Sequence, residues 1–280
     1  MLGVALALAA SVSWGLSDFL AGIQTRRFSA LSVLLVSQPV GLVLAFAVAL
    51  VLGGEPLPLG VFLIACAAGA TVVVALGAFY RAMALGSMSV ATTVGALGIL
   101  VPVVAGLLMG EAPAGIQAVG AAIAVPAVVL VAREPDPEWR RASRRSVGLA
   151  GAAALGFGTF FLLIDLAAER DPAWTIAAAR VGGVILLGAA ALYARPKLPQ
   201  ARGRVLAALL VIGIFDVTAN SLYAVATTHG ILPLVAVAGS LYAAVTVLLA
   251  RFVLGERLGP SQRAGFVLAI TGVALIAAGG

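Results

Sequence analysis

The chain has 280 residues, of which 62% are hydrophobic and only 10% are charged, and its formal net charge is +6. Soluble domains average about 25% charged residues, so this composition excludes a water-soluble globule and indicates an integral membrane protein. A positive net charge can also indicate nucleic-acid binding, but here the basic residues cluster in loops between apolar runs, which is typical of membrane orientation. We therefore expect a lipid bilayer, and no nucleic acid, as the partner of this surface. The single cysteine, Cys66, excludes an intrachain disulfide.

The first apolar run begins at Met1 without a positively charged segment or a clear cleavage site, and it contains Trp14 and Asp18. We interpret it as a retained helix and not as a signal peptide. A membrane-spanning helix needs about 20 mainly apolar residues, and cuts at proline, glycine and charge clusters leave ten such runs. The expected spans are 2–22, 31–52, 58–82, 87–109, 114–132, 147–168, 172–194, 205–228, 231–254 and 260–279.

None of these runs shows the period-2 alternation of strands, so the predicted fold class is an all-α integral membrane protein with ten transmembrane helices. Pro102 and Pro126 lie inside apolar runs and are expected to kink them.

A repeated pattern divides the chain into two halves. Glu111 follows a glycine and precedes Gln117 by six residues, and Glu256 follows a glycine and precedes Gln262 at the same spacing. Polar residues are scarce in this sequence, so the match indicates a duplicated unit. We expect a first five-helix repeat over 1–132, a basic linker over 133–146 and a second five-helix repeat over 147–280.

Five helices per unit is an odd number, so the second unit must enter the membrane from the opposite side, as in the inverted repeats of secondary transporters. With ten spans, one side receives nearly all the basic residues, and the positive-inside rule makes that side cytoplasmic. The protein is then a multi-pass protein of the cytoplasmic membrane with both termini outside. The basic residues of the cytoplasmic side are Arg26, Arg27, Arg81, Arg133, Arg140, Arg141, Arg144, Arg145, Arg195, Lys197, Arg202, Arg204, Arg251, Arg257 and Arg263.

Short motifs recur in a fixed order through both halves. They are Trp14-Gly15, the run from Tyr80 to Gly86, Pro102, Gly110-Glu111, the run from Tyr223 to Gly230, the run from Leu254 to Leu258, Gln262 and Gly265. Their order resembles that of the EamA-like members of the drug/metabolite transporter superfamily. The resemblance implies a substrate cavity lined by helices one to four and six to nine, and transport of small metabolites, often export of amino acids or drugs. Ala243 stands where the family has a proline in helix nine.

Ionisable residues inside a span are costly and mark functional sites. Asp216 lies near the middle of its run, and Asn220 and Tyr223 follow at i+4 and i+7, so the three share one helix face. This stripe either lines a cavity in which Asp216 binds a cationic group or a coupling proton, or Asp216 neutralises Arg180 and joins two helices. Asp165 is a rival partner for Arg180. An unpaired Arg180 would suit a substrate carboxylate, so that Arg180 and Asp216 would bind the two ends of an amino acid.

On the first helix, Trp14, Ser17 and Asp18 share one face. Asp18 is expected to pair with Arg81 at the cytoplasmic end of helix three, either as a structural pair or as a gate that breaks and re-forms. Trp14 lies too deep for an interfacial belt, so we expect it to line the cavity with Phe157, its counterpart in the second half.

Other polar groups within the spans are more often helix–helix hydrogen bonds than ligand contacts. Glu111 and Glu256 lie at helix ends, where the dipole of the following helix favours a carboxylate, and we interpret both as structural caps. The expected cavity set is Trp14, Ser17, Gln38, Tyr80, Thr92, Phe157, Arg180, Asp216, Asn220, Tyr223 and Tyr242.

The sequence has no Walker A motif, no HExxH motif and no Gly-x-Ser-x-Gly elbow, so we expect no enzyme activity, no cofactor and no catalytic residue. His229 is the single histidine and indicates no metal site. The expected function is secondary transport, as an exporter of small metabolites such as amino acids, amines or drugs, by alternating access as a monomer or homodimer, with protons as a candidate coupling ion. The alternatives are a facilitative uniporter without ion coupling and a membrane receptor or scaffold without transport.

Overall fold

The computed structural model describes residues 1–86, 88–111, 113, 115–132, 140–196, 198, 202–255 and 259–278. Every regular element in this part of the chain is a helix, which agrees with the predicted all-α class. The helices are α1 (Leu2–Thr25), α2 (Ala30–Leu52), α3 (Leu59–Leu85), α4 (Met88–Ala96), the 3-10 helix η1 (Leu97–Ile99), α5 (Leu100–Leu108), α6 (Gly115–Ala132), α7 (Arg140–Ala168), α8 (Pro172–Ala194), α9 (Arg204–Thr227), α10 (Leu232–Gly239), α11 (Tyr242–Leu254) and α12 (Pro260–Ala278).

Seven helical segments of the described chain are long and apolar enough to cross a membrane. Large apolar side chains stay exposed on their outer faces, as Val51 of α2 does with an exposed fraction of 85%. A surface of this kind needs lipid around it, so the chain is a multi-pass helical membrane protein. The seven segments are α1, α2, α3, residues Arg144–Ala168 of α7, α8, α9 and the α10–α11 segment Leu232–Leu254.

Two of the predicted runs are each divided into two helices. The run 87–109 breaks at η1, because Pro102 has no N–H to donate to the carbonyl of Gly98, four residues earlier. The run 231–254 breaks at Ser240 and Leu241, between α10 and α11, although its one proline, Pro233, lies in the first turn of α10 and not at the break. There the Ser240 hydroxyl donates to the carbonyl of Val237 at 2.8 Å, a local bond that competes with the regular helix ladder.

The other differences from the predicted elements are smaller. The helix α6 continues through Pro126, and α2 contains Pro39 in its interior. The predicted linker 133–146 is helical in its second part, because α7 begins at Arg140.

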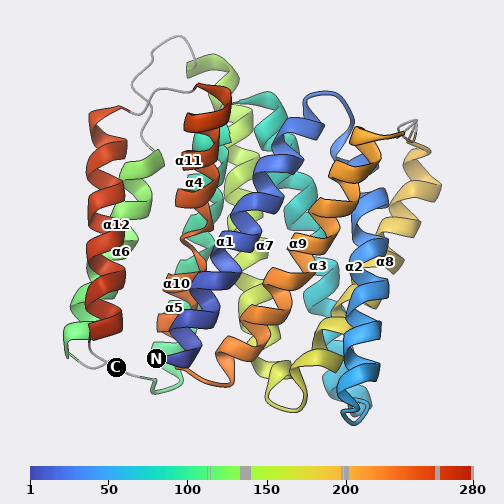
Figure 1. Cartoon of the computed structure of the whole chain (residues 1–280), viewed down its shortest axis with the longest axis horizontal. Helices are drawn as coiled ribbons and strands as arrows, with labels where there is room; N and C mark the ends of the chain where they lie inside the picture. The colour runs from blue at the N-terminus through green and yellow to red at the C-terminus, as the bar shows by residue number, and fades with distance from the viewer. Residues whose placement is uncertain are drawn as a thin grey trace.

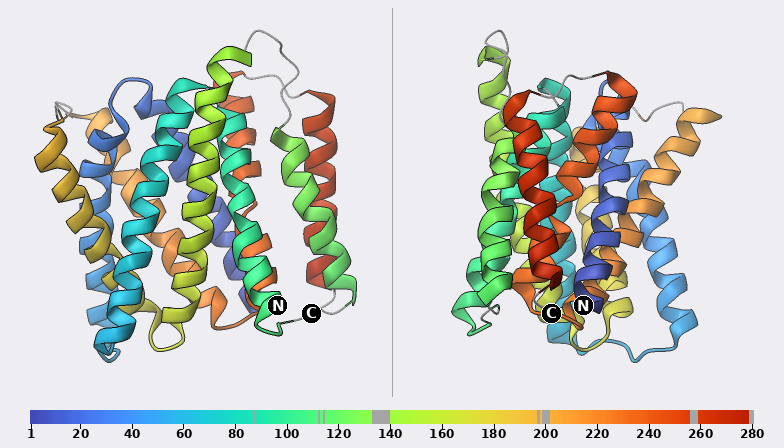
Figure 2. Two further views of the ribbon diagram at one scale, coloured as in Figure 1. Left: turned by 180° about the vertical axis from the view of Figure 1, so that it is seen from behind. Right: turned by 60° about the vertical axis from the view of Figure 1, so that its left-hand side comes forward.

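The helices form one flattened bundle in which sequence-distant segments lie side by side (Figure 1). The pair α6–α12 forms one edge, and α2 and α8 lie together at the other (Figures 1 and 2). Between these edges, α1 packs on α9 and α3 packs on α7. The helix α1 begins and α12 ends at the same end of the bundle, opposite the α1–α2 turn (Figure 1).

The packing of α3 on α8 depends on two glycines. A Cβ atom at Gly69 would collide with the carbonyl oxygen of Ala179, and one at Gly182 would collide with the carbonyl oxygen of Cys66. In a bilayer, where no hydrophobic effect drives helices together, such close backbone contact supplies much of the association energy.

Candidate functional site

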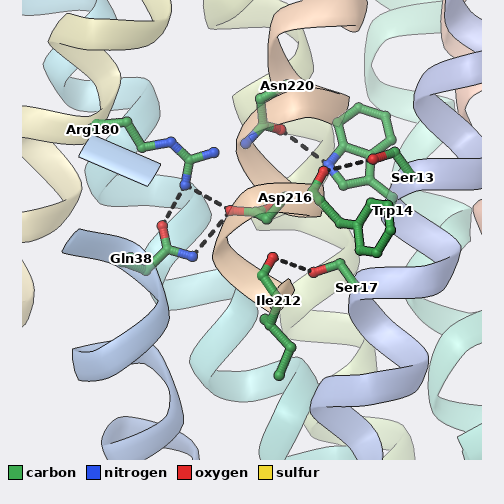
Figure 3. A network of polar contacts seen from close by, with 9 residues as sticks. Ser13, Trp14, Ser17, Gln38, Arg180, Ile212, Asp216 and Asn220 are labelled. Carbon is green, nitrogen blue, oxygen red and sulfur yellow. Dashed lines mark hydrogen bonds and ion pairs between the residues drawn. The ribbon is translucent and has the colours of Figure 1, made fainter. Parts of the chain in front are cut away.

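A buried ion pair between two helices of the second half lies near the middle of the bundle. Arg180 of α8 donates through Nη1 to Oδ2 of Asp216 on α9 at 2.6 Å, and both side chains are 5% exposed. Gln38 of α2 completes the group, since its Oε1 accepts from Arg180 Nη1 and its Nε2 donates to Asp216 Oδ2 at 3.1 Å (Figure 3). We call these three residues the brace. The structure therefore pairs Arg180 with Asp216 and not with the rival Asp165.

A second set of contacts fixes α1 against α9. The hydroxyls of Ser13 and Ser17 donate to the backbone carbonyls of Phe215 and Ile212 at 2.8 and 3.0 Å (Figure 3). Both carbonyls lie in the helical turn just before Asp216, so the two serines fix the position of that turn against α1.

Trp14 extends this contact with its indole ring. Its Nε1 donates to Oδ1 of Asn220 at 3.0 Å (Figure 3). The ring lies 5.4 Å from that of Phe161, 5.6 Å from that of Tyr223 and 6.4 Å from that of Tyr242, in tilted or edge-on geometry. Aromatic pairs at these distances and angles attract one another, so four helices share one aromatic cluster.

A cavity lies beside this cluster, and we call it the chamber. A smaller neighbouring cavity is lined by Gln38 and Arg180 and shares Val72, Phe160 and Asn220 with the chamber. The chamber walls come from α1, α3, α7, α9 and α11, so both halves contribute. Its lining residues are Trp14, Asp18, Val72, Leu76, Phe157, Phe160, Phe161, Asp216, Asn220 and Tyr242.

Asp18 lies on the chamber wall and not in an ion pair at the membrane surface. Its side chain is buried, with 5% exposed, whereas Arg81 points outward from α3 and is exposed. No hydrogen bond or ion pair of Asp18 occurs within the described residues, so the expected pair with Arg81 is not formed. The physical reason is position along the helix: α1 extends to Thr25, which leaves Asp18 about two turns inside the span on the same face as Trp14.

The remaining predicted cavity residues are all buried but differ in their contacts. Tyr80 lies beside Ser17 and Asp18. Thr92 donates back to the Met88 carbonyl of its own helix at 2.7 Å, which serves the helix and not a ligand. Tyr223 packs its ring in the aromatic cluster.

Glu111 caps a helix, but a different one from the helix that the sequence indicated. Its Oε2 accepts from the backbone N–H of Leu232 at 2.8 Å, so it caps α10 in the second half and not the following helix α6. The corresponding Glu256 lies outside the described residues.

Several chamber residues were missed by the sequence reasoning. Phe160 and Phe161 follow Phe157 at i+3 and i+4, so the helical period could have placed all three on one face. Val72 and Leu76 of α3 carry no polar signal in an apolar run. Among the described residues, no cluster of three or more metal-ligating side chains occurs.

These features define the class: a helical membrane protein with a polar, aromatic-walled chamber between two halves of one chain. The sequence matches the EamA-like transporter family over residues 1–133 and 144–278, and the chain belongs to that family, which confirms the resemblance stated above. A solved structure titled "Crystal structure of protein" superposes with a TM-score of 0.72 at 14% identity, covering 98% of this chain and 95% of the other, which is a likeness of fold. No curated protein sequence matched the chain.

Proposed function

We propose that the protein is a secondary transporter that moves small molecules such as amino acids, amines or drugs across the cytoplasmic membrane by alternating access. The observation that carries this proposal is the chamber, which holds buried charged groups and is walled by both halves of a chain of the EamA-like transporter family. A receptor or scaffold does not need such a cavity, because it gains nothing from burying charge inside a bilayer.

The proposed architecture is ten transmembrane helices in two oppositely inserted repeats. The first comprises α1, α2, α3, the α4–η1–α5 segment and α6, and the second comprises α7, α8, α9, the α10–α11 segment and α12. Exchanging the two repeats maps the observed helix pairs onto one another: α1–α9 onto α7–α3, and α3–α8 onto α9–α2. The pairs α2–α8 and α6–α12 map onto themselves. A two-fold relation within the membrane plane accounts for this pattern.

The proposed orientation follows from charge. The arginines of the α1–α2 turn, Arg26 and Arg27, and those beside α8 and α9, Arg195 and Arg204, lie at helix ends on one side, and the positive-inside rule assigns that side to the cytoplasm. Both termini are then outside, and we propose export as the direction.

Flux into sealed vesicles tests the function. Purified protein is reconstituted, and uptake of a labelled panel of amines, amino acids and drugs is compared with that of protein-free vesicles, with and without a pH gradient. Val72→Trp should abolish flux because Val72 lines the chamber, and Val74→Trp is the matched control because Val74 lies on the same helix with 62% of its side chain exposed. Absence of flux for the whole panel, or equal flux in both variants, contradicts the proposal.

Labelling of single cysteines tests the inverted architecture. With Cys66 replaced by alanine, a membrane-impermeant thiol reagent should reach Gly115→Cys at the start of α6 from outside and Arg263→Cys in α12 from inside. Labelling of both positions from one side would contradict the inverted repeat.

A further inference from the structure

The buried charges of the bundle do not balance. Among the described residues, three acidic or basic side chains are buried: Asp18, Arg180 and Asp216. Arg180 donates through Nη1 to Asp216 and Gln38 and not to Asp18, so with both carboxylates ionised these three side chains carry a formal charge of −1. A buried charge without a partner is costly, and either a proton on the carboxylate or a cation bound beside it would remove that cost.

The place for such a cation is beside Asp18. This carboxylate is 95% buried, lines the chamber and has no hydrogen-bond or ion-pair partner within the described part of the chain. Asp216 is near enough to act on it electrostatically, and the hydroxyl of Tyr242, also on the chamber wall, is buried with no hydrogen-bond partner in the described part of the chain. The local field is therefore negative, and acceptor groups are available.

The residues that line the chamber indicate which kind of cation fits it. The aromatic rings of Trp14, Phe157, Phe160 and Phe161 face the same space, and such rings attract a cation over their faces. A small metal ion needs several oxygen ligands, and the lining offers only two carboxylates, the Asn220 amide and the Tyr242 hydroxyl. The chamber is better matched to an organic ammonium group with an apolar body.

We propose that Asp18 binds the ammonium group of a monovalent organic amine, whose apolar or aromatic body lies among the chamber rings. This proposal rests on the proposed transport function and names its substrate class. An amine without a carboxylate is favoured over an amino acid, because the chamber lining includes the carboxylates of Asp18 and Asp216, which would repel a substrate carboxylate, and does not include Arg180.

The test is ligand binding to the purified full chain, followed by the fluorescence of Trp14. The other two tryptophans are removed as Trp139→Phe and Trp174→Phe, and 2-phenylethylamine, which is protonated at neutral pH like lysine, is titrated against the neutral 2-phenylethanol and the zwitterion phenylalanine. The amine should bind about tenfold or more tightly than the alcohol, as expected for one charge-assisted contact. Equal or weaker binding of the amine than of either comparison ligand overturns the proposal, without any further variant.

Variants of Asp18 test whether this residue causes the preference for the amine. Asp18→Asn should remove the preference for the amine over the alcohol, whereas Asp18→Glu should retain it. The matched control is Asp165→Asn, a span carboxylate outside the chamber lining, which should leave the preference unchanged. Circular dichroism and a single gel-filtration peak establish that each variant is folded. A folded Asp18→Asn protein that keeps the full preference overturns the assignment, as does loss of the preference in a folded Asp165→Asn protein.

Flux measurements on the same proteins separate this proposal from the proposed function. An amine preference that depends on Asp18, in a protein without flux, upholds the site and refutes transport. Flux that persists while Asp18→Asn keeps its preference for the amine upholds transport and refutes the site.

Discussion

The two carboxylates near the centre of the bundle lie in opposite circumstances. Asp216 accepts from Arg180 at 2.6 Å and from Gln38 at 3.1 Å, so three helices hold it in place. Asp18, on the facing wall of the chamber, has aromatic rings around it and no such partner among the described residues. Burial of an acidic residue therefore does not by itself identify a binding group. Asp216 is part of a structural contact between the halves, whereas Asp18 is free to receive a ligand.

Breaking the brace should have the largest effect. Arg180→Met leaves Asp216 buried without a cation and should lower the free energy of unfolding by about 3–5 kcal/mol. The double variant Arg180→Met with Asp216→Leu should recover most of that loss, because apolar residues often replace a buried ion pair without cost. Equilibrium unfolding in mixed detergent micelles measures both. A double variant as unstable as the single one would contradict a purely structural brace.

The next effect concerns the indole of Trp14. Trp14→Phe keeps the ring contacts but leaves Asn220 Oδ1 without its donor, which should cost about 1–3 kcal/mol. Trp174→Phe is the matched control, since its indole bonds to the carbonyl of Gly54 at 2.9 Å in a partly buried site, and water can replace that bond. Thermal unfolding followed by circular dichroism should show a larger loss for Trp14. If Trp174→Phe lowered the stability as much as Trp14→Phe, burial of the indole would not determine the cost of losing its hydrogen bond.

Neutralising Asp18, unlike the two changes above, should not lower the free energy of unfolding. Asp18→Asn removes a buried carboxyl group that has no partner among the described residues, so stability should be retained or rise by about 1 kcal/mol in ligand-free protein. The same substitution at Asp216 should destabilise, because it removes the counter-ion of Arg180. Side-by-side unfolding curves of the two asparagine variants test the comparison directly, and equal losses would show that the two carboxylates have the same role.

The smallest effect is expected at Tyr242. Its hydroxyl is buried and has no partner within the described residues, so Tyr242→Phe should change the free energy of unfolding by less than about 0.5 kcal/mol. Amine binding should weaken in the same variant if the hydroxyl contributes to the chamber. A clear loss of stability would show that this hydroxyl is bonded in the native protein.

Much of the fold could be predicted from sequence because hydropathy and span length are direct physical requirements of a bilayer. The ten apolar runs agree closely with the helices or helix pairs of the structure, and Pro102 correctly indicated a disruption of run four. The break between α10 and α11 was not predicted, because Ser240 and Leu241 carry no signal as strong as a proline.

The site was predictable where helical periodicity alone decides which residues share a face. Trp14 and Phe157, from the two halves, line one chamber, and the stripe that begins with Asp216 and Asn220 faces it. Pairing across helices was harder, because rotation about each helix axis depends on packing. The sequence placed Asp18 beside Arg81, but α3 turns that arginine outward, and the carboxylate faces the chamber instead.

The contact between Glu111 and Leu232 has a consequence for biosynthesis. A loop of the first half supplies the acceptor for the first turn of α10, 121 residues later in the chain. Since a polypeptide emerges from its N-terminus, this acceptor is already inserted when α10 leaves the ribosome. The helix α10 therefore acquires its N-terminal cap from a segment that is made earlier. If the two halves were produced as separate polypeptides, they would have to associate before α10 could be capped.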